Sequence, residues 1–182
     1  MEVYSTKFKG LKMIKIKKFT DLRGNVIRIL NKKKKYSNFN CFESYVSFSK
    51  KGAIRGLHGQ KGKFSQKKLI YCLKGKAIDI AVDLRKNSKS FGKIFKKTID
   101  AKDSLAILIP EGFAHGLISL NKDTIVINFC SSVFKPSKEF GVNFKSLQIK
   151  LPKMKLVKSS GKSIKEAEKN AAKFVLDIIS AK

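Results

Sequence analysis

The chain has 182 residues and a formal net charge of +28, from 41 Lys and Arg against 13 Asp and Glu. This length suits one domain that buries its core without disulfides or metal, and the three cysteines form no Cys-x-x-Cys pair. Only four basic residues are Arg and the Lys are spread over nearly every segment, so the charge indicates a lysine-rich surface that favours an anionic small substrate. We expect no nucleic-acid partner.

The apolar stretches are short. Residues 1–19 alternate Lys with apolar residues and lack the continuous apolar segment of a secretory signal. No later apolar run approaches the length of a membrane span. We therefore expect a single domain over 1–182 that is reduced and cytoplasmic, with no membrane partner.

Period-two alternation of apolar and polar residues dominates the chain and predicts an all-β fold of about nine short strands. The predicted strands are 13–19, 25–30, 43–48, 68–73, 76–84, 93–98, 104–109, 115–120 and 124–129. One amphipathic helix is predicted at 163–180, where Ser163 and Glu166 form a capping box. The predicted architecture is a barrel over 13–160 followed by this C-terminal helix.

The chain has two histidines, His58 in "IRGLHGQ" and His115 in "PEGFAHG". The pattern Pro-x-Gly-x-x-His resembles the second motif of cupin barrels, whose metal-binding members also carry His-x-His and a Glu in a first motif. Here the first motif reads His58-Gly59-Gln60, and two lone histidines are too few for a transition metal that needs three or more protein ligands. We expect no metal and no cofactor.

Four linked segments carry a longer resemblance, in order and with nearly constant spacing: "DLRGN" (21–25), "RGLHGQ" (55–60), "KLIYCLKGKAIDIAVDLRKNSKSFGK" (68–93) and "ILIPEGFAHGLISL" (107–120). Together they resemble the dTDP-4-dehydrorhamnose 3,5-epimerase family over about residues 13 to 165. The resemblance implies a cupin-type jelly roll that is metal-free and forms a homodimer, with residues 13–19 as a candidate exchanged edge strand. It also implies a nucleotide-diphospho-4-keto sugar as substrate and a role in surface polysaccharide precursor synthesis.

The family reaction requires a base, a positive group at the developing enolate oxygen, and an acid on the opposite face of the sugar. By resemblance, His58 is the base and Lys68 lies near the sugar oxygens; without that context, a lone barrel histidine would more often be a core residue. Asn128 stands where the family has its acid tyrosine, and an amide cannot donate a proton at a useful pKa. Asp79 lies in an apolar strand, so we expect it to have a buried partner, Lys68 or His58.

Substrate contacts also follow from the resemblance, with several departures from the family. The family's Gln-Asp-Asn segment reads Glu43-Ser44-Tyr45, and a family glutamate corresponds to Arg28. Near the C terminus the family's Ser-Glu-Lys-Asp aligns with residues 160–163, which bring no carboxylate to orient the base. The implied substrate-binding residues are Arg23, Arg28, Glu43, Tyr45, Arg55, Gln60, Asp79, His115, Glu139 and Lys162.

These departures leave alternatives open. The carrier could be GDP or CDP rather than dTDP, the sugar a hexose or a heptose, and the inversion at C3, C5 or both. A keto-sugar isomerase of the same fold usually has a second histidine close to the first, and Gly59 and Gln60 argue against it. A non-catalytic sugar-nucleotide-binding homologue that has lost the acid is the other alternative.

Overall fold

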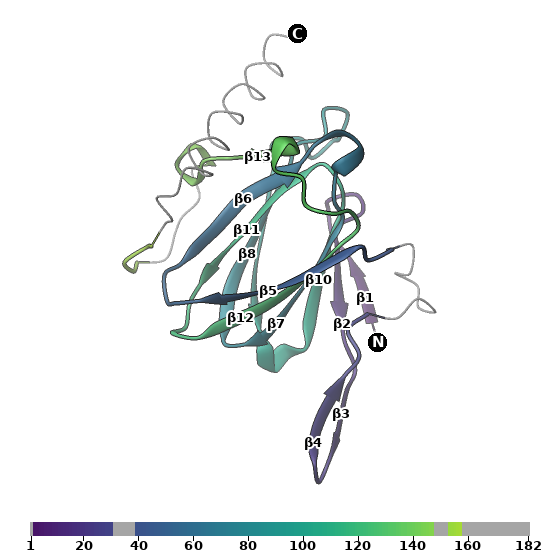
Figure 1. Cartoon of the computed structure of the whole chain (residues 1–182), viewed down its shortest axis with the longest axis vertical. Coiled ribbons are helices and arrows are strands. Elements are labelled where there is room, and N and C mark those ends of the chain that lie inside the picture. The colour runs from purple at the N-terminus through teal and green to yellow at the C-terminus, as the bar shows by residue number, and fades with distance from the viewer. Residues whose placement is uncertain (1, 31–38, 148–152, 158–182) are drawn as a thin grey trace.

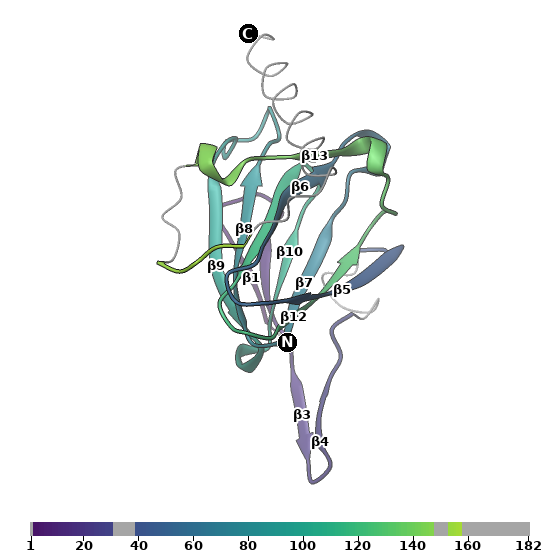
Figure 2. The ribbon, with the colours of Figure 1, turned by 60° about the vertical axis from the view of Figure 1, so that its left-hand side comes forward.

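The alternating segments pair into two antiparallel sheets that face each other (Figures 1 and 2). The structure is a computed structural model that describes residues 2–30, 39–147 and 153–157. One sheet has six strands in the order β1 (Glu2–Ser5), β2 (Lys12–Lys15), β10 (Leu105–Ile109), β7 (Lys68–Lys74), β12 (Thr124–Cys130) and β5 (Glu43–Ser49). The other has five, in the order β13 (Glu139–Gly141), β6 (Ile54–Gln60), β11 (Phe113–Ser119), β8 (Lys76–Asp83) and β9 (Ile94–Asp100). The short 3-10 helices are η1 (Gly62–Phe64), η2 (Ala101–Asp103), η3 (Pro136–Lys138) and η4 (Phe144–Leu147).

This arrangement confirms the all-β, jelly-roll prediction, and each of the nine predicted segments contains a strand. The segment 13–19 is divided between β2 and β3 (Lys18–Asp21). Strands β1, β6 and β13 were not predicted from the alternation. The predicted helix at 163–180 lies outside the described residues.

The core has three layers, because apolar side chains cover both outer faces as well as the space between the sheets. The inner cluster includes Phe8, Ile70, Phe95, Ile107 and Phe113, each less than a tenth exposed. On β7, Ile70 belongs to the inner cluster while its neighbours Leu69 and Tyr71 belong to a cluster on the other face. Burying an Ile or Phe side chain contributes roughly 1.5–3 kcal/mol. Strands β7, β8 and β11 are therefore buried along nearly their whole length rather than on one face only.

Glycines allow β6 and β11 to approach closely beside the histidines. Gly56 has a φ of +90°, and a Cβ placed on it would lie 2.4 Å from the backbone oxygen of His115. A Cβ on Gly116 would lie 2.4 Å from the backbone oxygen of Arg55. The register of the two strands shifts between His115 and Leu117, and His115 pairs directly with His58.

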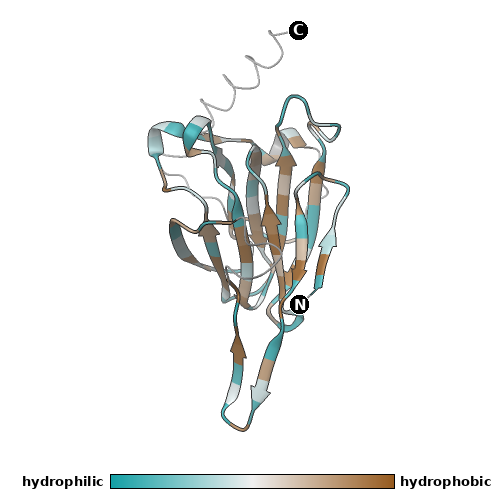
Figure 3. Cartoon of the chain, turned by 90° about the vertical axis from the view of Figure 1, so that its right-hand side faces the viewer, coloured by the Kyte–Doolittle hydropathy of each residue, from teal (hydrophilic) through white to brown (hydrophobic). Residues whose placement is uncertain are grey.

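A separate hairpin, β3 with β4 (Gly24–Ile27), projects away from the two sheets (Figures 1 and 3). Its apolar residues Phe19, Leu22 and Val26 are exposed. Strand β2 pairs with β1 on one side and β10 on the other, so within this chain residues 12–15 do not form a sheet edge. The edges of the described six-stranded sheet are β1 and β5.

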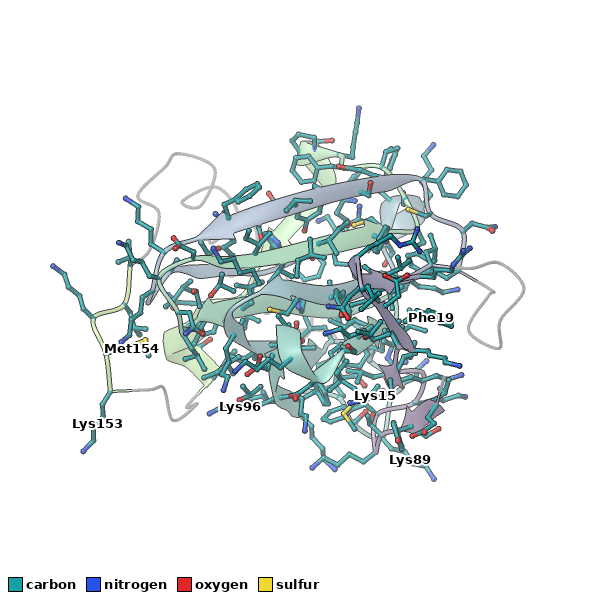
Figure 4. All side chains as sticks on the ribbon, turned by 90° about the horizontal axis from the view of Figure 1, so that it is seen from below. Lys15, Phe19, Lys89, Lys96, Lys153 and Met154 are labelled. Carbon is teal, nitrogen blue, oxygen red and sulfur yellow. The ribbon has the colours of Figure 1, made fainter. Side chains whose placement is uncertain are left out.

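Lysines surround the body rather than gathering on one face. Lys89, Lys96 and Lys153 are exposed, and Figure 4 shows them at separate places on the periphery. This agrees with the dispersed charge of the sequence. In the described ranges there is no helix with the length and apolarity needed to span a membrane.

Candidate active site

A two-part cavity is lined by residues of both sheets. The first part has a volume of about 360 Å³ and is lined by residues that include Tyr45, Arg55, His58, His115 and Asn128. The second has a volume of about 240 Å³ and is lined by residues that include Glu43, Tyr45, His58, Lys68 and Glu139. Tyr45 and His58 line both parts, which places these two side chains at the junction.

His58 lies on β6 with its imidazole held by a carboxylate. Its Nδ1 is 3.1 Å from Oε1 of Glu139, which β13 brings alongside β6. Burial lowers the pKa of His58 below its ordinary value of 6.5, and the nearby charge of Lys68 lowers it further, while the hydrogen bond to Glu139 acts in the opposite direction. The imidazole is therefore neutral near pH 7, as a base requires. The sequence assigned Glu139 to substrate binding and gave His58 no carboxylate partner.

His115 forms a second imidazole–carboxylate pair, on the neighbouring strands β11 and β8. Its Nε2 is 2.7 Å from Oδ2 of Asp79, and both side chains are almost completely buried. The predicted buried partner of Asp79 is present, but it is His115 and not Lys68 or His58. Asp79 pairs in register with Leu117, two residues from His115, so the two side chains are diagonal neighbours on one sheet face. The other carboxylate oxygen, Oδ1, has no hydrogen-bond partner among the described residues.

Lys68 faces these groups from the first residue of β7 in the opposite sheet. Its side chain is buried, and burial lowers its pKa from the ordinary value. The carboxylates of Glu139, Glu43 and Asp79 act against that shift. A desolvated ammonium group at this position is suited to stabilise negative charge that develops on a substrate oxygen.

Asn128 and Tyr45 lie on the same sheet as Lys68, on adjacent strands. Asn128 on β12 is 3% exposed, and Tyr45 on β5 is 39% exposed. The two residues are direct register partners. On β5, Tyr45 alternates with Ser47 and Ser49 on one face, while Val46 and Phe48 are the more exposed residues between them.

Two predicted binding residues are held by contacts within the protein. Arg55 donates from Nε to Ser49 Oγ at 2.8 Å and from Nη2 to the backbone oxygen of Phe48 at 2.7 Å, which ties β6 to the edge strand β5. Gln60 donates from Nε2 to two backbone oxygens, each at 3.0 Å. Arg55 lines the first part of the cavity and Gln60 the second.

Among the described residues, the predicted binding residues Arg23, Arg28 and Asp79 do not line this cavity. Arg23 lies at the turn of the β3–β4 hairpin and pairs with Asp21 at 2.6 Å. Arg28 directly follows the same hairpin, and neither arginine lines the cavity of its own chain. Lys162 lies outside the described residues.

Sequence reasoning also missed residues that line the cavity. Phe48 and Phe134, which are 69% and 49% exposed, lie at its walls. Phe48 is one of the exposed residues of β5, and Phe134 follows β12 in a loop with no periodic signal. Within the residues that the structure describes, no three His, Cys, Asp or Glu side chains gather as a metal site.

The chain is similar to known proteins along most of its length. The sequence model of the family described as dTDP-4-dehydrorhamnose 3,5-epimerase matches residues 5–174. The Shigella flexneri protein of that name is 32% identical over 84% of this chain and 87% of its own length. The Salmonella typhimurium protein is 36% identical, but its match covers 64% of each chain. A match to the Neisseria gonorrhoeae protein covers 56% of that relative.

Solved structures show the same fold. The dTDP-4-dehydrorhamnose 3,5-epimerase of Bacillus anthracis, determined with TDP and PPi bound, superposes with a TM-score of 0.83 at 32% identity, covering 92% of this chain and 97% of that chain. The dTDP-6-deoxy-D-glucose-3,5-epimerase of Legionella pneumophila, in complex with dTDP-4-keto-L-rhamnose, gives 0.82 at 28% identity, covering 90% of each. A family match over residues 5–174, with the matching fold, shows that this chain belongs to the dTDP-4-dehydrorhamnose 3,5-epimerase family.

Proposed function

We propose that the protein is a cofactor-independent epimerase of a nucleotide-diphospho-4-keto-6-deoxy sugar. It inverts C3, C5 or both through an enolate, in the synthesis of surface polysaccharide precursors. The observation that carries the proposal is the placement of His58, held by Glu139 at 3.1 Å, across the cavity from Lys68. Base and cation thus come from opposite sheets.

The first step uses His58 as a base. A C–H bond next to the 4-keto group is acidic because the resulting negative charge moves to the carbonyl oxygen. The neutral Nε2 of His58 takes the proton, while Nδ1 stays hydrogen-bonded to Glu139, whose carboxylate stabilises the imidazolium that forms. Lys68 stabilises the enolate oxygen. Return of a proton to the same carbon from the other face gives the inverted sugar.

The proposed substrate is an anionic nucleotide-diphospho sugar. The Bacillus anthracis relative was determined with TDP and PPi, which supports a nucleoside diphosphate carrier here. Glu43 and Tyr45 replace residues of the family's Gln-Asp-Asn segment, which supports testing GDP and CDP carriers, and heptose as well as hexose sugars. Because we also propose that the protein acts in the cytoplasm, the candidate substrates are sugar nucleotides made there.

A homodimer is part of the proposal. The β3–β4 hairpin exposes Phe19, Leu22 and Val26, and it holds Arg23 away from the cavity of its own chain. In a dimer, this hairpin would bring Arg23 and Arg28 to the cavity of the second copy. Sedimentation equilibrium of the full chain, which gives the mass directly, tests this; a monomer at micromolar concentration contradicts it.

The test of the proposed function is turnover of dTDP-, GDP- and CDP-linked 4-keto-6-deoxy sugars, followed by NMR of the ring protons. We expect an inverted product with at least one carrier and none with His58→Asn. One alternative is favoured by Asn128, which removes the family's acid: a non-catalytic homologue that only binds the sugar nucleotide. Calorimetric binding without turnover of any of these compounds would support that homologue and contradict the epimerase.

A further inference from the structure

Inversion requires a proton donor on the sheet that faces His58. A sugar ring lying between the sheets presents one face to each, and His58 occupies the five-stranded side. A proton returned by His58 itself would restore the original configuration. The amide of Asn128, on the six-stranded side, cannot supply the second proton.

The other polar residues of that sheet in the cavity are poorly suited to the task. Ser47 donates its hydroxyl proton to a backbone oxygen of β12. Glu43 accepts a backbone N–H through its carboxylate. Lys68 lines the second part of the cavity, and the proposed function already uses it as the cation that stabilises the enolate oxygen. Of the polar cavity residues on the six-stranded sheet, this leaves Tyr45 as the neutral side chain that can donate a proton.

The position of Tyr45 fits a donor. Tyr45 and Asn128 are direct partners on β5 and β12, and opposed residues in an antiparallel pair have Cα atoms about 4.5–5.5 Å apart. The side chain of Tyr45 therefore comes from the strand next to that of Asn128, and both side chains line the first part of the cavity. Tyr45 and His58 line both parts. We propose that Tyr45 is the general acid that protonates the enolate carbon on the face opposite His58.

The resemblance to the family also connects positions 45 and 128. The family pattern has a tyrosine at the position of Asn128 and the asparagine of its Gln-Asp-Asn segment at the position of Tyr45. The register now shows that these two positions face each other across one strand pair. By this resemblance, the tyrosine in this pair of positions lies on the edge strand β5 rather than on β12.

The electrostatic surroundings keep Tyr45 protonated until it is needed. Burial raises the pKa of Tyr45 above its ordinary value, the negative charges of Glu43 and Glu139 raise it further, and the positive charge of Arg55 acts against them. During the step the phenolic O–H bond breaks as the new C–H bond forms, and Arg55 stabilises the phenolate. The phenolate regains a proton from water, which its 39% exposure permits, and the imidazolium of His58 releases one. No net proton is consumed.

The inference rests on the proposed function, and the experiment separates the two. Wild type, Tyr45→Phe, Asn128→Tyr and the double variant Y45N/N128Y are incubated in D2O with the 4-keto sugar nucleotide that wild type converts. NMR then measures deuterium in recovered substrate and the amount of inverted product. Tyr4→Phe is the matched control, because Tyr4 is 45% exposed on β1 and does not line the cavity.

Tyr45→Phe should retain deuterium exchange into the substrate, since His58 is intact, while inverted product forms at least about 10²-fold more slowly. The double variant should recover inversion, because it restores a tyrosine at 128. Tyr4→Phe should match wild type.

Inversion by Tyr45→Phe at the wild-type rate would overturn the assignment of Tyr45 and leave Lys68 or water as the donor. Loss of exchange and inversion together in Tyr45→Phe, with no recovery in the double variant, would also overturn it. Absence of both exchange and inversion in wild type would instead refute the proposed function.

Discussion

The two histidines sit side by side on β6 and β11, and each has its own carboxylate, but their environments differ. The His58 side chain is 37% exposed and lines the cavity, whereas the His115 side chain is 5% exposed and its Asp79 partner 0%. Only His58 therefore combines access to a substrate with room to exchange its proton. His115 lines the first part of the cavity, and Asp79 holds it from the neighbouring strand β8.

The hydrogen bond between Glu139 and His58 leads to a prediction about how kcat/KM depends on pH. His58 must be neutral to act, so kcat/KM falls at low pH with an acid limb set by its pKa, which lies below 6.5. The hydrogen bond to Glu139 raises that pKa, so Glu139→Gln should move the acid limb to still lower pH. The same change should reduce kcat by on the order of 10²-fold or more, as loss of the orienting carboxylate does in catalytic triads.

A pH profile of kcat/KM for wild type and Glu139→Gln measures both effects. Glu111→Gln is the control, because Glu111 also faces a cation, Lys67 at 3.9 Å, but on the surface. An acid limb that moves to higher pH, or does not move, would show that Glu139 does not act on His58.

The strands that carry the histidines differ in how well the sequence predicted them. Alternation predicted β12, where every second side chain is buried, and it also predicted β5, β7 and β8, although β7 and β8 are buried along most of their length. It did not predict β6, because Gly56 and Gly59 interrupt the pattern in "IRGLHGQ". The glycines are there because β11 approaches so closely that a Cβ has no room. That approach is a property of the partner strand, and no local pattern records it.

Gly56→Ala should therefore destabilise the protein more than a positive φ alone explains. An alanine in the left-handed region costs about 1–2 kcal/mol, and at Gly56 its Cβ would also meet backbone atoms at 2.4 and 2.8 Å. Gly62→Ala is the matched control, with a φ of +66° and no atom within 4 Å of its Cβ. Urea denaturation should show a loss of about 3 kcal/mol or more for Gly56→Ala and about 1 kcal/mol for Gly62→Ala. Equal losses would mean that the close approach of β6 and β11 contributes nothing.

At the scale of the whole molecule, the two sheets divide the chemistry between them. The five-stranded sheet contributes His58 and Glu139, and the six-stranded sheet contributes Lys68, Tyr45 and Asn128. The family resemblance gave His58 and Lys68 as catalytic residues, and both side chains line the cavity. It could not predict that Tyr45 and Asn128 are register partners, because the register between β5 and β12 is set by the packing of distant segments. For the same reason it left His58 without Glu139, and the apolar strand around Asp79 indicated a buried partner without identifying it as His115.

The net charge of +28 gives a prediction for kinetics. Dispersed lysines attract an anionic sugar nucleotide over distances of the Debye length, which falls from about 30 Å at 0.01 M salt to about 8 Å at 0.15 M. Raising the salt over this range should lower kcat/KM several-fold and leave kcat unchanged, because screening affects the encounter and not the buried groups. Steady-state kinetics at several salt concentrations measures this. A fall in kcat with constant KM would contradict it.

The central claim is that His58 removes a proton from carbon next to the 4-keto group. The most direct measurement is NMR of the converted sugar nucleotide after reaction in D2O, with wild type and His58→Asn. The account predicts solvent deuterium at each inverted carbon in the wild-type product, and exchange at least about 10²-fold slower in His58→Asn. Inverted product without deuterium, or unchanged exchange in His58→Asn, would contradict it.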